Sequence, residues 1–302
     1  MPLPVMTVET DRKGIILAGG SGTRLAPLTG YVTKQLLPVY DKPMIYYPLS
    51  LLMLAGIRDM LLISDQDNQP LIQKVFGGGE QFGLRISYAI QPKPRGLAEA
   101  FLIAEDFIGG APACLALGDN ILYGHQLTDI LRKAANAETS TIFGMHVRNP
   151  SDYGVVTVDA AGVPVAIEEK PTHPASNIAV PGLYFFDRNV VGLARQVRPS
   201  ARGELEITAI IASYIEDRRL NLEILGRGFA WIDAGTHSSL LEASNFVEMI
   251  ERRQSQKIGC IEEIAYNSGW ISAGQLRELA EGFGKSSYGE YLMGLLSQAP
   301  QR

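Results

Sequence analysis

The sequence has few cysteines, no excess of positive charge and no long uninterrupted hydrophobic run. Its 302 residues include only Cys114 and Cys260, which lie too far apart to indicate a disulfide framework or a zinc site and suit a reducing cytoplasm. The formal net charge of −5 argues against nucleic-acid binding. The longest apolar stretch, residues 44–57, is interrupted by Pro48 and Ser50 and is too short to span a membrane. We therefore expect a cytoplasmic protein without a nucleic-acid or membrane partner.

Residues 1–12 carry neither a cationic start nor a long apolar core, so they do not resemble a signal peptide. We expect this segment to be a mobile tail. Of the whole chain, 46% of residues are hydrophobic and 20% are charged, which is enough apolar material for a sizeable globular core.

Strand and helix patterns alternate over the first 120 residues, which predicts an α/β fold with a doubly wound, mostly parallel Rossmann-like sheet. Strands are expected at 14–18, 59–64, 85–89 and 114–117, and helices at 43–55 and 97–107. Sheets of this kind bind ligands at the carboxyl ends of their strands. The loops that follow the strands should therefore converge on one site.

The second half of the chain predicts an inserted β-hairpin and a helical C-terminal appendage at 254–302. Strands are expected at 140–147, 155–158, 163–168, 178–186, 220–225 and 229–232, and helices at 124–137, 190–197, 204–217, 237–253, 272–281 and 288–296. No internal repeat or clean linker interrupts the chain, which favours one integrated unit.

A glycine-rich loop follows the first expected strand and contains Gly19, Gly20 and Gly22. Such a loop lets backbone N–H groups approach a ligand closely. Arg24 and Lys34 follow within a dozen residues, and a guanidinium offers a planar fork of donors that suits phosphate. The pattern favours a site for a polyphosphate, on a long loop that carries Lys34.

The two common phosphate-binding motifs do not fit this loop. A P-loop requires a Lys-Ser/Thr pair after the glycines, and none is present. A dinucleotide fingerprint requires a third glycine where Leu25 stands. A plain glycine-rich turn with a surface arginine is the alternative that the glycines alone leave open.

Two aspartates, Asp119 and Asp233, each follow an apolar strand. Carboxylates at such positions can hold a hard cation that also contacts substrate phosphates, the usual arrangement for Mg²⁺. Each aspartate alone could equally be a turn or helix-capping residue. Lys170, in the run Glu-Glu-Lys-Pro, is placed to reach a phosphate but also fits a solvated charge cluster. The four histidines and Ser21 form no catalytic group, so no covalent nucleophile is indicated.

The runs L-A-G-G-x-G-T-R-L and K-Q-L-L-P-V resemble the signature of sugar-1-phosphate nucleotidylyltransferases. Residues 34–47 are most similar to the thymidylyl-transferring members, and the resemblance extends over residues 13–296. It implies transfer from dTTP to glucose 1-phosphate with Mg²⁺, a domain at 13–253 with nucleotide-binding (13–135) and sugar-binding (140–236) parts, a homotetramer, and feedback inhibition by a dTDP-sugar.

The resemblance also assigns roles to individual residues. Arg24, Lys34 and Lys170 would be catalytic, and Asp119 and Asp233 would bind the metal. The nucleotide would contact Leu17, Gly19, Gly20, Gly22, Thr23, Arg24, Lys34, Gln91, Gly96, Leu97 and Asp119, with Gln91, Gly96 and Leu97 forming the loop that reads the base. The sugar phosphate would contact Tyr153, Gly154, Glu169, Lys170 and Tyr184.

The sequence departs from the family pattern at Arg95, Pro181, Ala209 and Ala234, none of which is an expected phosphate or metal ligand. Two alternatives remain open. A UTP-using enzyme would recognise uracil, which lacks the methyl group of thymine. A binding pocket discriminates one methyl group by only about 1–3 kcal/mol. A regulator that binds nucleotide sugars without turnover is the other, although the retained charged residues argue against it.

Overall fold

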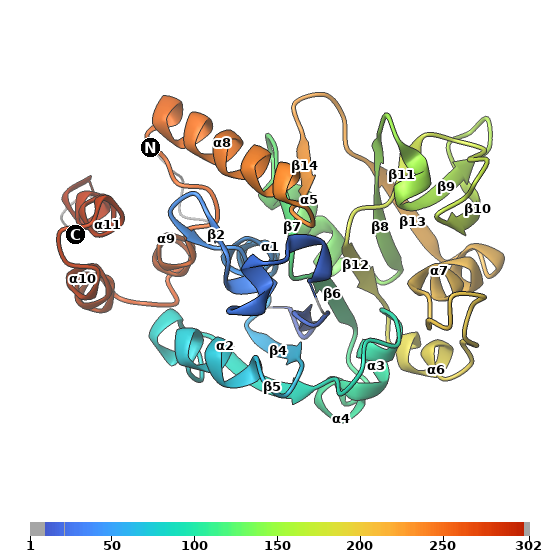
Figure 1. Cartoon of the computed structure of the whole chain (residues 1–302), viewed down its shortest axis with the longest axis horizontal. Helices are drawn as coiled ribbons and strands as arrows, with labels where there is room; N and C mark the ends of the chain where they lie inside the picture. The colour runs from blue at the N-terminus through green and yellow to red at the C-terminus, as the bar shows by residue number, and fades with distance from the viewer. Residues whose placement is uncertain (1–9, 21, 299–302) are drawn as a thin grey trace.

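The computed structural model describes residues 10–20 and 22–298, and its centre is a ten-stranded sheet (Figure 1). The strand order is β10-β9-β11-β8-β12-β6-β1-β4-β5, with β13 also paired to β8. The strands are β1 (Lys13–Leu17), β4 (Asp59–Ser64), β5 (Arg85–Ile90), β6 (Ala113–Leu117), β8 (Ser140–His146), β9 (Gly154–Val158), β10 (Pro164–Glu169), β11 (Ile178–Ala179), β12 (Leu183–Phe186) and β13 (Leu220–Ile224).

Strands β5, β4, β1 and β6 are parallel neighbours, which confirms the doubly wound α/β prediction. The chain builds outward from β1 to β4 and β5, and then returns to the other side of β1 with β6. The strand order therefore switches between β1 and β6, and a ligand crevice is expected beyond the carboxyl ends of these two strands. The β9–β10 hairpin is antiparallel, as predicted, and forms the far edge of the sheet.

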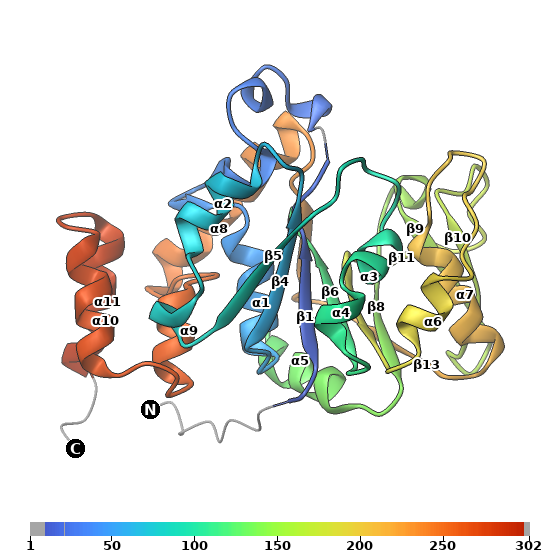
Figure 2. The same ribbon diagram turned by 90° about the horizontal axis from the view of Figure 1, so that it is seen from below.

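Helices cover both faces of the sheet, as the view in Figure 2 shows. Each face has its own apolar core. On one face lie α1 (Tyr46–Leu54), α2 (Gln69–Phe76), α5 (Leu127–Asn136), α8 (His237–Gln254) and α9 (Ile261–Asn267). On the other lie α3 (Glu99–Ile103), α4 (Glu105–Ile108), α6 (Val190–Ala194) and α7 (Ile207–Glu216).

Short elements surround the carboxyl ends of the central strands. They include β7 (Asn120–Tyr123) paired with β14 (Ala230–Asp233), β2 (Pro38–Val39) paired with β3 (Lys42–Pro43), and the 3₁₀ turns η1 (Thr23–Leu25), η2 (Leu28–Gly30), η3 (Lys34–Leu36) and η5 (Pro150–Asp152). A further 3₁₀ turn, η4 (Glu80–Phe82), instead precedes β5 at its amino end. The predicted long loop that carries Lys34 is confirmed, because the described residues between β1 and β2 form only short 3₁₀ turns and their connections. Lys34 itself begins η3 and is buried.

The expected strand at 178–186 is wrong as a continuous element, because β11 and β12 are separated by a break at Pro181 and Gly182. Proline has no N–H to donate to a ladder. The Gly182 N–H instead donates to Asn120 Oδ1 at 3.0 Å, and its carbonyl accepts from the Leu117 N–H at 2.8 Å. The break thereby ties the sheet to the start of β7.

Other boundaries also differ from the expectations. The expected helix at 97–107 is two helices, α3 and α4, and α9 was not expected at all. Residues 1–9 of the predicted mobile tail lie outside the described residues. Arg12, however, is only 2% exposed and donates hydrogen bonds to the carbonyl oxygens of Ala113 at 3.1 Å and Phe186 at 2.5 Å. The tail prediction is wrong at this residue because buried carbonyls satisfy its guanidinium.

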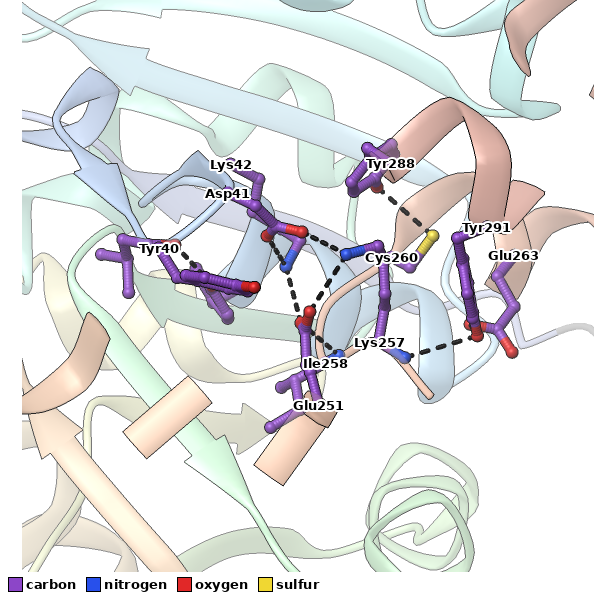
Figure 3. Close-up of polar contacts among 12 residues, drawn as sticks. Tyr40, Asp41, Lys42, Glu251, Lys257, Ile258, Cys260, Glu263, Tyr288 and Tyr291 are labelled. Carbon is purple, nitrogen blue, oxygen red and sulfur yellow. Dashed lines mark hydrogen bonds and ion pairs between the residues drawn. The ribbon is translucent and has the colours of Figure 1, made fainter. Parts of the chain in front are cut away.

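The C-terminal appendage consists of α9, α10 (Ala273–Gly282) and α11 (Ser287–Gln298), which form the outermost layer beside α1 and α2 (Figures 1 and 2). A buried charge cluster joins it to the turn between β2 and β3, as Figure 3 shows. Lys42 Nζ lies 3.0 Å from Glu251 Oε1 and 2.6 Å from Asp41 Oδ1, and Lys257 Nζ lies 3.1 Å from Glu251 Oε2. The chain just after Lys34 is thus fastened to the appendage.

Candidate active site

The glycine loop adopts a backbone that requires glycine. Gly20 and Gly22 have φ values of +110° and +57°, in the left-handed region. A Cβ on Gly22 would lie 2.8 Å from Thr29 Cγ2, and a Cβ on Gly19 would lie 3.2 Å from Gln91 Oε1. Ser21 lies outside the described residues. The loop is therefore packed closely between η2 and the end of β5, directly after β1.

Arg24 and Lys34 reach the same place from two 3₁₀ turns. Arg24 is exposed on η1, and its Nη2 lies 2.9 Å from the position that a Cβ on Gly235 would take, next to Asp233. Lys34 is buried on η3, and its ammonium forms an ion pair with Asp119. The two expected cations of the glycine loop therefore each lie beside one of the two expected metal-binding aspartates.

Asp119 and Asp233 are brought together by the β7–β14 ladder. Asp233 lies opposite Asn120 in this ladder, and the Ala234 N–H donates to the Asp119 carbonyl oxygen at 3.1 Å. Burial raises the pKa of Asp233, and the neighbouring Asp119 carboxylate raises that pKa further, while Lys34 and Arg24 oppose the shift. The arrangement concentrates negative charge at the ends of β6 and β14.

These two carboxylates fit a divalent cation. Asp233 Oδ1 is buried and has no hydrogen-bond partner among the described residues, which is a costly position for an ionised oxygen unless a cation occupies the space beside it. Within residues 10–20 and 22–298, no group of three or more acidic, histidine or cysteine side chains forms a complete metal cage. A cation held by only two protein carboxylates is completed by waters or substrate phosphates.

Asn120 is a site residue that the sequence analysis missed. It is 5% exposed; its Oδ1 accepts from Trp231 Nε1 at 2.6 Å, and its Nδ2 donates to Asp119 Oδ1 at 2.9 Å. The amide therefore sets the rotamer of Asp119. The available signal was a polar residue between an aspartate and the apolar run of β7, a pattern that is also typical of a turn.

The expected sugar-binding residues gather along β9 and β10. The Tyr153 ring packs on Trp231 with centroids 4.7 Å apart, and the Lys170 N–H donates to the Tyr153 carbonyl oxygen at 3.0 Å. Lys170 is exposed and has a φ of +44°. Glu169 lies opposite Gly154 in the β9–β10 ladder. Hydrogen bonds and pairing thus hold these four residues as one group.

Charged groups around the sugar-side residues and around Asp119 influence one another. Burial raises the pKa of Glu169, and Glu206 raises it further. The pKa of the buried Tyr184 is also raised, first by burial and then by the negative charges of Glu169 and Asp119. The carboxylates of Glu169 and Asp119 thus both contribute negative charge around Tyr184.

The expected base-reading loop is anchored on both sides. Gln91 is buried at the end of β5, and its N–H donates to the Ser64 carbonyl oxygen at 2.8 Å. Gly96 has a φ of +110°, and a Cβ there would lie 2.5 Å from the Leu205 nitrogen. The Ala98 N–H donates to the Leu205 carbonyl oxygen at 3.0 Å, so this loop bridges β5 and the segment before α7.

The structure thus brings the sequence-predicted residues into three adjoining groups. The glycine loop packs against Gln91, and the two cations that follow the loop lie beside the two aspartates. Tyr153 of the sugar-side group packs on Trp231, in the strand that ends at Asp233. Cys114 and Cys260 are free and buried, and burial raises the pKa of both thiols, so neither is suited to act as a nucleophile. Among the described residues, no helix has the length and hydrophobicity needed to traverse a bilayer.

The glycine loop follows β1 at the switch point of the doubly wound sheet, and two carboxylates and two cations lie beside it. The family model described as nucleotidyl transferase matches residues 13–249, and the chain belongs to this family. Curated relatives over nearly the whole chain are named glucose-1-phosphate thymidylyltransferase. That of Xanthomonas campestris pv. campestris is 56% identical over 95% of this chain and 97% of its own, and that of Neisseria meningitidis serogroup A is 54% identical over 95% and 100%.

Solved structures show the same fold. A Bacillus anthracis protein described as a glucose-1-phosphate thymidylyltransferase, in complex with sucrose, has a TM-score of 0.71 and 36% identity over 78% of this chain and 94% of its own. A UDP-glucose pyrophosphorylase complexed with UDP-glucose has a TM-score of 0.70 and 25% identity over 79% of this chain and 99% of its own. The fold is therefore shared by proteins whose names point to different nucleotides.

Proposed function

We propose that this protein transfers a thymidylyl group from dTTP to glucose 1-phosphate, giving dTDP-glucose and pyrophosphate. The observation that carries the proposal is the β7–β14 ladder, which sets Asp119 and Asp233 together beside Arg24 and Lys34 at the end of β1. Relatives more than 50% identical over 95% of the chain bear the name of this activity.

The chemistry asks for position and charge neutralisation rather than for a base. The phosphate of glucose 1-phosphate is ionised at pH 7, so its oxygen can attack the α-phosphorus of dTTP directly while pyrophosphate leaves in line. The exposed Arg24 guanidinium binds the triphosphate and stabilises the charge that develops on pyrophosphate. Lys170 orients the attacking phosphate, and Lys34 supplies further positive charge while holding Asp119.

Asp119 and Asp233 would hold Mg²⁺, which when bound neutralises phosphate charge between nucleotide and sugar phosphate. The buried Asp233 Oδ1, unpartnered among the described residues, supports this assignment. Asn120 holds the rotamer of Asp119 through its amide N–H, so the carboxylate is positioned before any substrate arrives.

On the sugar side, Glu169 would accept hydrogen bonds from sugar hydroxyls, with Tyr153, Gly154 and Tyr184 shaping the pocket. Two departures from the family pattern leave this group intact. Pro181 is buried at the break between β11 and β12, and Ala234 keeps its main-chain hydrogen bond to Asp119. Ala209 is exposed on α7.

A UTP-using enzyme is the second candidate, because a UDP-glucose pyrophosphorylase shares the fold at a TM-score of 0.70. Its identity of 25% is far below that of the relatives named for thymidylyl transfer, so we place dTTP first.

We further propose a cytoplasmic homotetramer that a dTDP-sugar inhibits, on family resemblance. Two buried free cysteines suit a reducing compartment, and the exposed Leu241 and Met249 on α8 offer apolar surface for a subunit contact.

The deciding experiment measures pyrophosphate release from the purified protein with Mg²⁺ and glucose 1-phosphate, comparing dTTP, UTP, ATP, CTP and GTP at equal concentration. Fastest release with dTTP is the expected result. Preference for UTP would favour the second candidate. No release with any nucleotide, together with tight binding of dTDP-sugars, would favour a regulator without turnover. Light scattering on the same preparation tests the tetramer.

A further inference from the structure

Glu99 at the start of α3 makes a contact that none of the expected site roles requires. Gln91 Nε2 donates to Glu99 Oε2 at 2.8 Å, although Gln91 directly follows β5 and Glu99 begins α3. The Glu99 side chain is only 12% exposed, whereas Arg95, whose Nε lies 3.5 Å from Glu99 Oε1, is 65% exposed. The carboxylate is therefore shielded and paired, and it lies directly behind the amide of Gln91.

The chemistry of this contact fixes which way the amide faces. An ionised carboxylate only accepts hydrogen bonds, so the group that faces it must be the NH₂ end of the amide and not the oxygen. The oxygen end is accordingly placed on the other side, where Gln91 Oε1 would lie 3.2 Å from a Cβ on Gly19. One N–H of Gln91 and its Oε1 have no hydrogen-bond partner within the described part of the chain, and they lie beside the glycine loop.

An amide held in one orientation distinguishes two pyrimidines that differ in hydrogen-bond pattern. Thymine and uracil offer an O4 acceptor beside an N3–H donor, while cytosine offers an N4–H donor beside an N3 acceptor. The same amide rotated by 180° would suit cytosine. Without a constraint on the amide, either orientation would be available to bind either base.

We infer that Glu99 is a positioning residue that selects nucleotides with a thymine or uracil edge over those with a cytosine edge, by holding the amide of Gln91 in one orientation. The inference rests on the proposed function, because it takes Gln91 as the residue that reads the base. Glu99 itself contacts no substrate. Its place in the first turn of α3 gives it a rigid support, and Arg95 adds a partner from the solvent side.

The test compares kcat/KM for dTTP and dCTP in the wild-type protein and in Glu99→Gln, with pyrophosphate release as the readout. The amide that this substitution introduces can donate as well as accept, so Gln91 is released to rotate. We expect the dTTP-to-dCTP ratio to fall by about tenfold or more, in the range of one bidentate base contact. Glu105→Gln is the matched control: Glu105 is an exposed glutamate at the start of α4 that pairs with Arg195, and the ratio in this variant should equal that of the wild type.

Glu99→Asp keeps a carboxylate, which only accepts hydrogen bonds. Its dTTP-to-dCTP ratio should therefore lie nearer to the wild-type ratio than to that of Glu99→Gln, even if turnover falls. Equal dTTP-to-dCTP ratios in the wild type and Glu99→Gln would overturn the inference. A ratio in Glu99→Asp as low as in Glu99→Gln would also overturn it, because the loss would then come from altered packing and not from the orientation of the Gln91 amide. A wild-type protein that does not use dTTP would instead contradict the proposed function.

Discussion

Asp119 and Asp233 are joined through the main chain, because the N–H of Ala234, the residue after Asp233, donates to the carbonyl oxygen of Asp119 at 3.1 Å. This bond and the ladder beside it hold two carboxylates together in a partly buried site. Burial raises the pKa of Asp233, and the like charge of Asp119 raises it further. The two carboxylates therefore repel each other, and a bound cation would relieve this repulsion. The first prediction follows from this.

Replacing Asp233 should stabilise the metal-free protein while abolishing turnover. Because the folded-state pKa of Asp233 is raised above its unfolded value, the free energy of unfolding falls as pH rises between the two values, and the ionised group costs stability above the folded value. Asp233→Asn should remove this part of the pH dependence and raise the free energy of unfolding at neutral pH by about 0.5–2 kcal/mol. Urea unfolding between pH 4 and 8 measures it.

Mg²⁺ should raise the melting temperature of the wild type and leave that of Asp233→Asn unchanged. Asp217→Asn, at an exposed aspartate that ends α7, is the control and should retain both the metal effect and the pH dependence. Identical metal shifts in the wild type and Asp233→Asn would show that Asp233 does not bind the cation.

Arg24→Ala should lower kcat by about two to three orders of magnitude with the fold intact, as expected when a charge that stabilises the transition state is removed. Arg24 is exposed, so the free energy of unfolding should change by less than about 0.5 kcal/mol. Arg253→Ala, at the opposite end of α8 from the site, should leave both quantities unchanged. Near-normal turnover in Arg24→Ala would contradict the role of its guanidinium.

Glu251→Ala should destabilise the protein by about 3–5 kcal/mol, because it removes the buried carboxylate that Lys42 and Lys257 share. The Glu251 side chain is 6% exposed, and that of Lys42 only 2%. Glu248→Ala is the matched control on the same helix: Glu248 pairs with Arg252 at an exposed position, and its loss should cost less than about 1 kcal/mol. Chemical denaturation compares the two variants, and equal losses would mean that the buried cluster does not fasten the appendage.

Gly96→Ala should destabilise the protein by about 1–3 kcal/mol or more, because the new Cβ meets the Leu205 backbone and the φ of +110° disfavours any side chain. Gly110→Ala separates the two causes, since Gly110 also has a positive φ but no atom within 4 Å of the added Cβ. A thermal-melting comparison measures both. If Gly96→Ala loses no more than Gly110→Ala, the contact with Leu205 does not constrain the loop.

The expected strands at 59–64 and 114–117 match β4 and β6 closely, because each is a short apolar run buried between two neighbouring strands. The expected strand at 85–89 matches β5, which lies at the edge of the sheet and pairs with β4. The expected strand at 178–186 failed for the opposite reason. Its apolar pattern is continuous, but Pro181 cannot join a ladder and Gly182 is recruited by Asn120 from another element. The apolar pattern of a segment predicts a strand well where the same pattern also determines which strands it pairs with.

By itself the sequence determined the doubly wound sheet, the glycine loop with Arg24 and Lys34, and the two aspartates at strand ends, because apolar periodicity and strand-end loops are local properties. Only the tertiary structure decided which residues hold them. Asn120 and Trp231 hydrogen-bond across 111 residues of sequence, and Glu99 meets Gln91 through the meeting of a strand and a helix. Such contacts depend on where the sheet and the helices place side chains, and the spacing of residues along the sequence does not predict these positions.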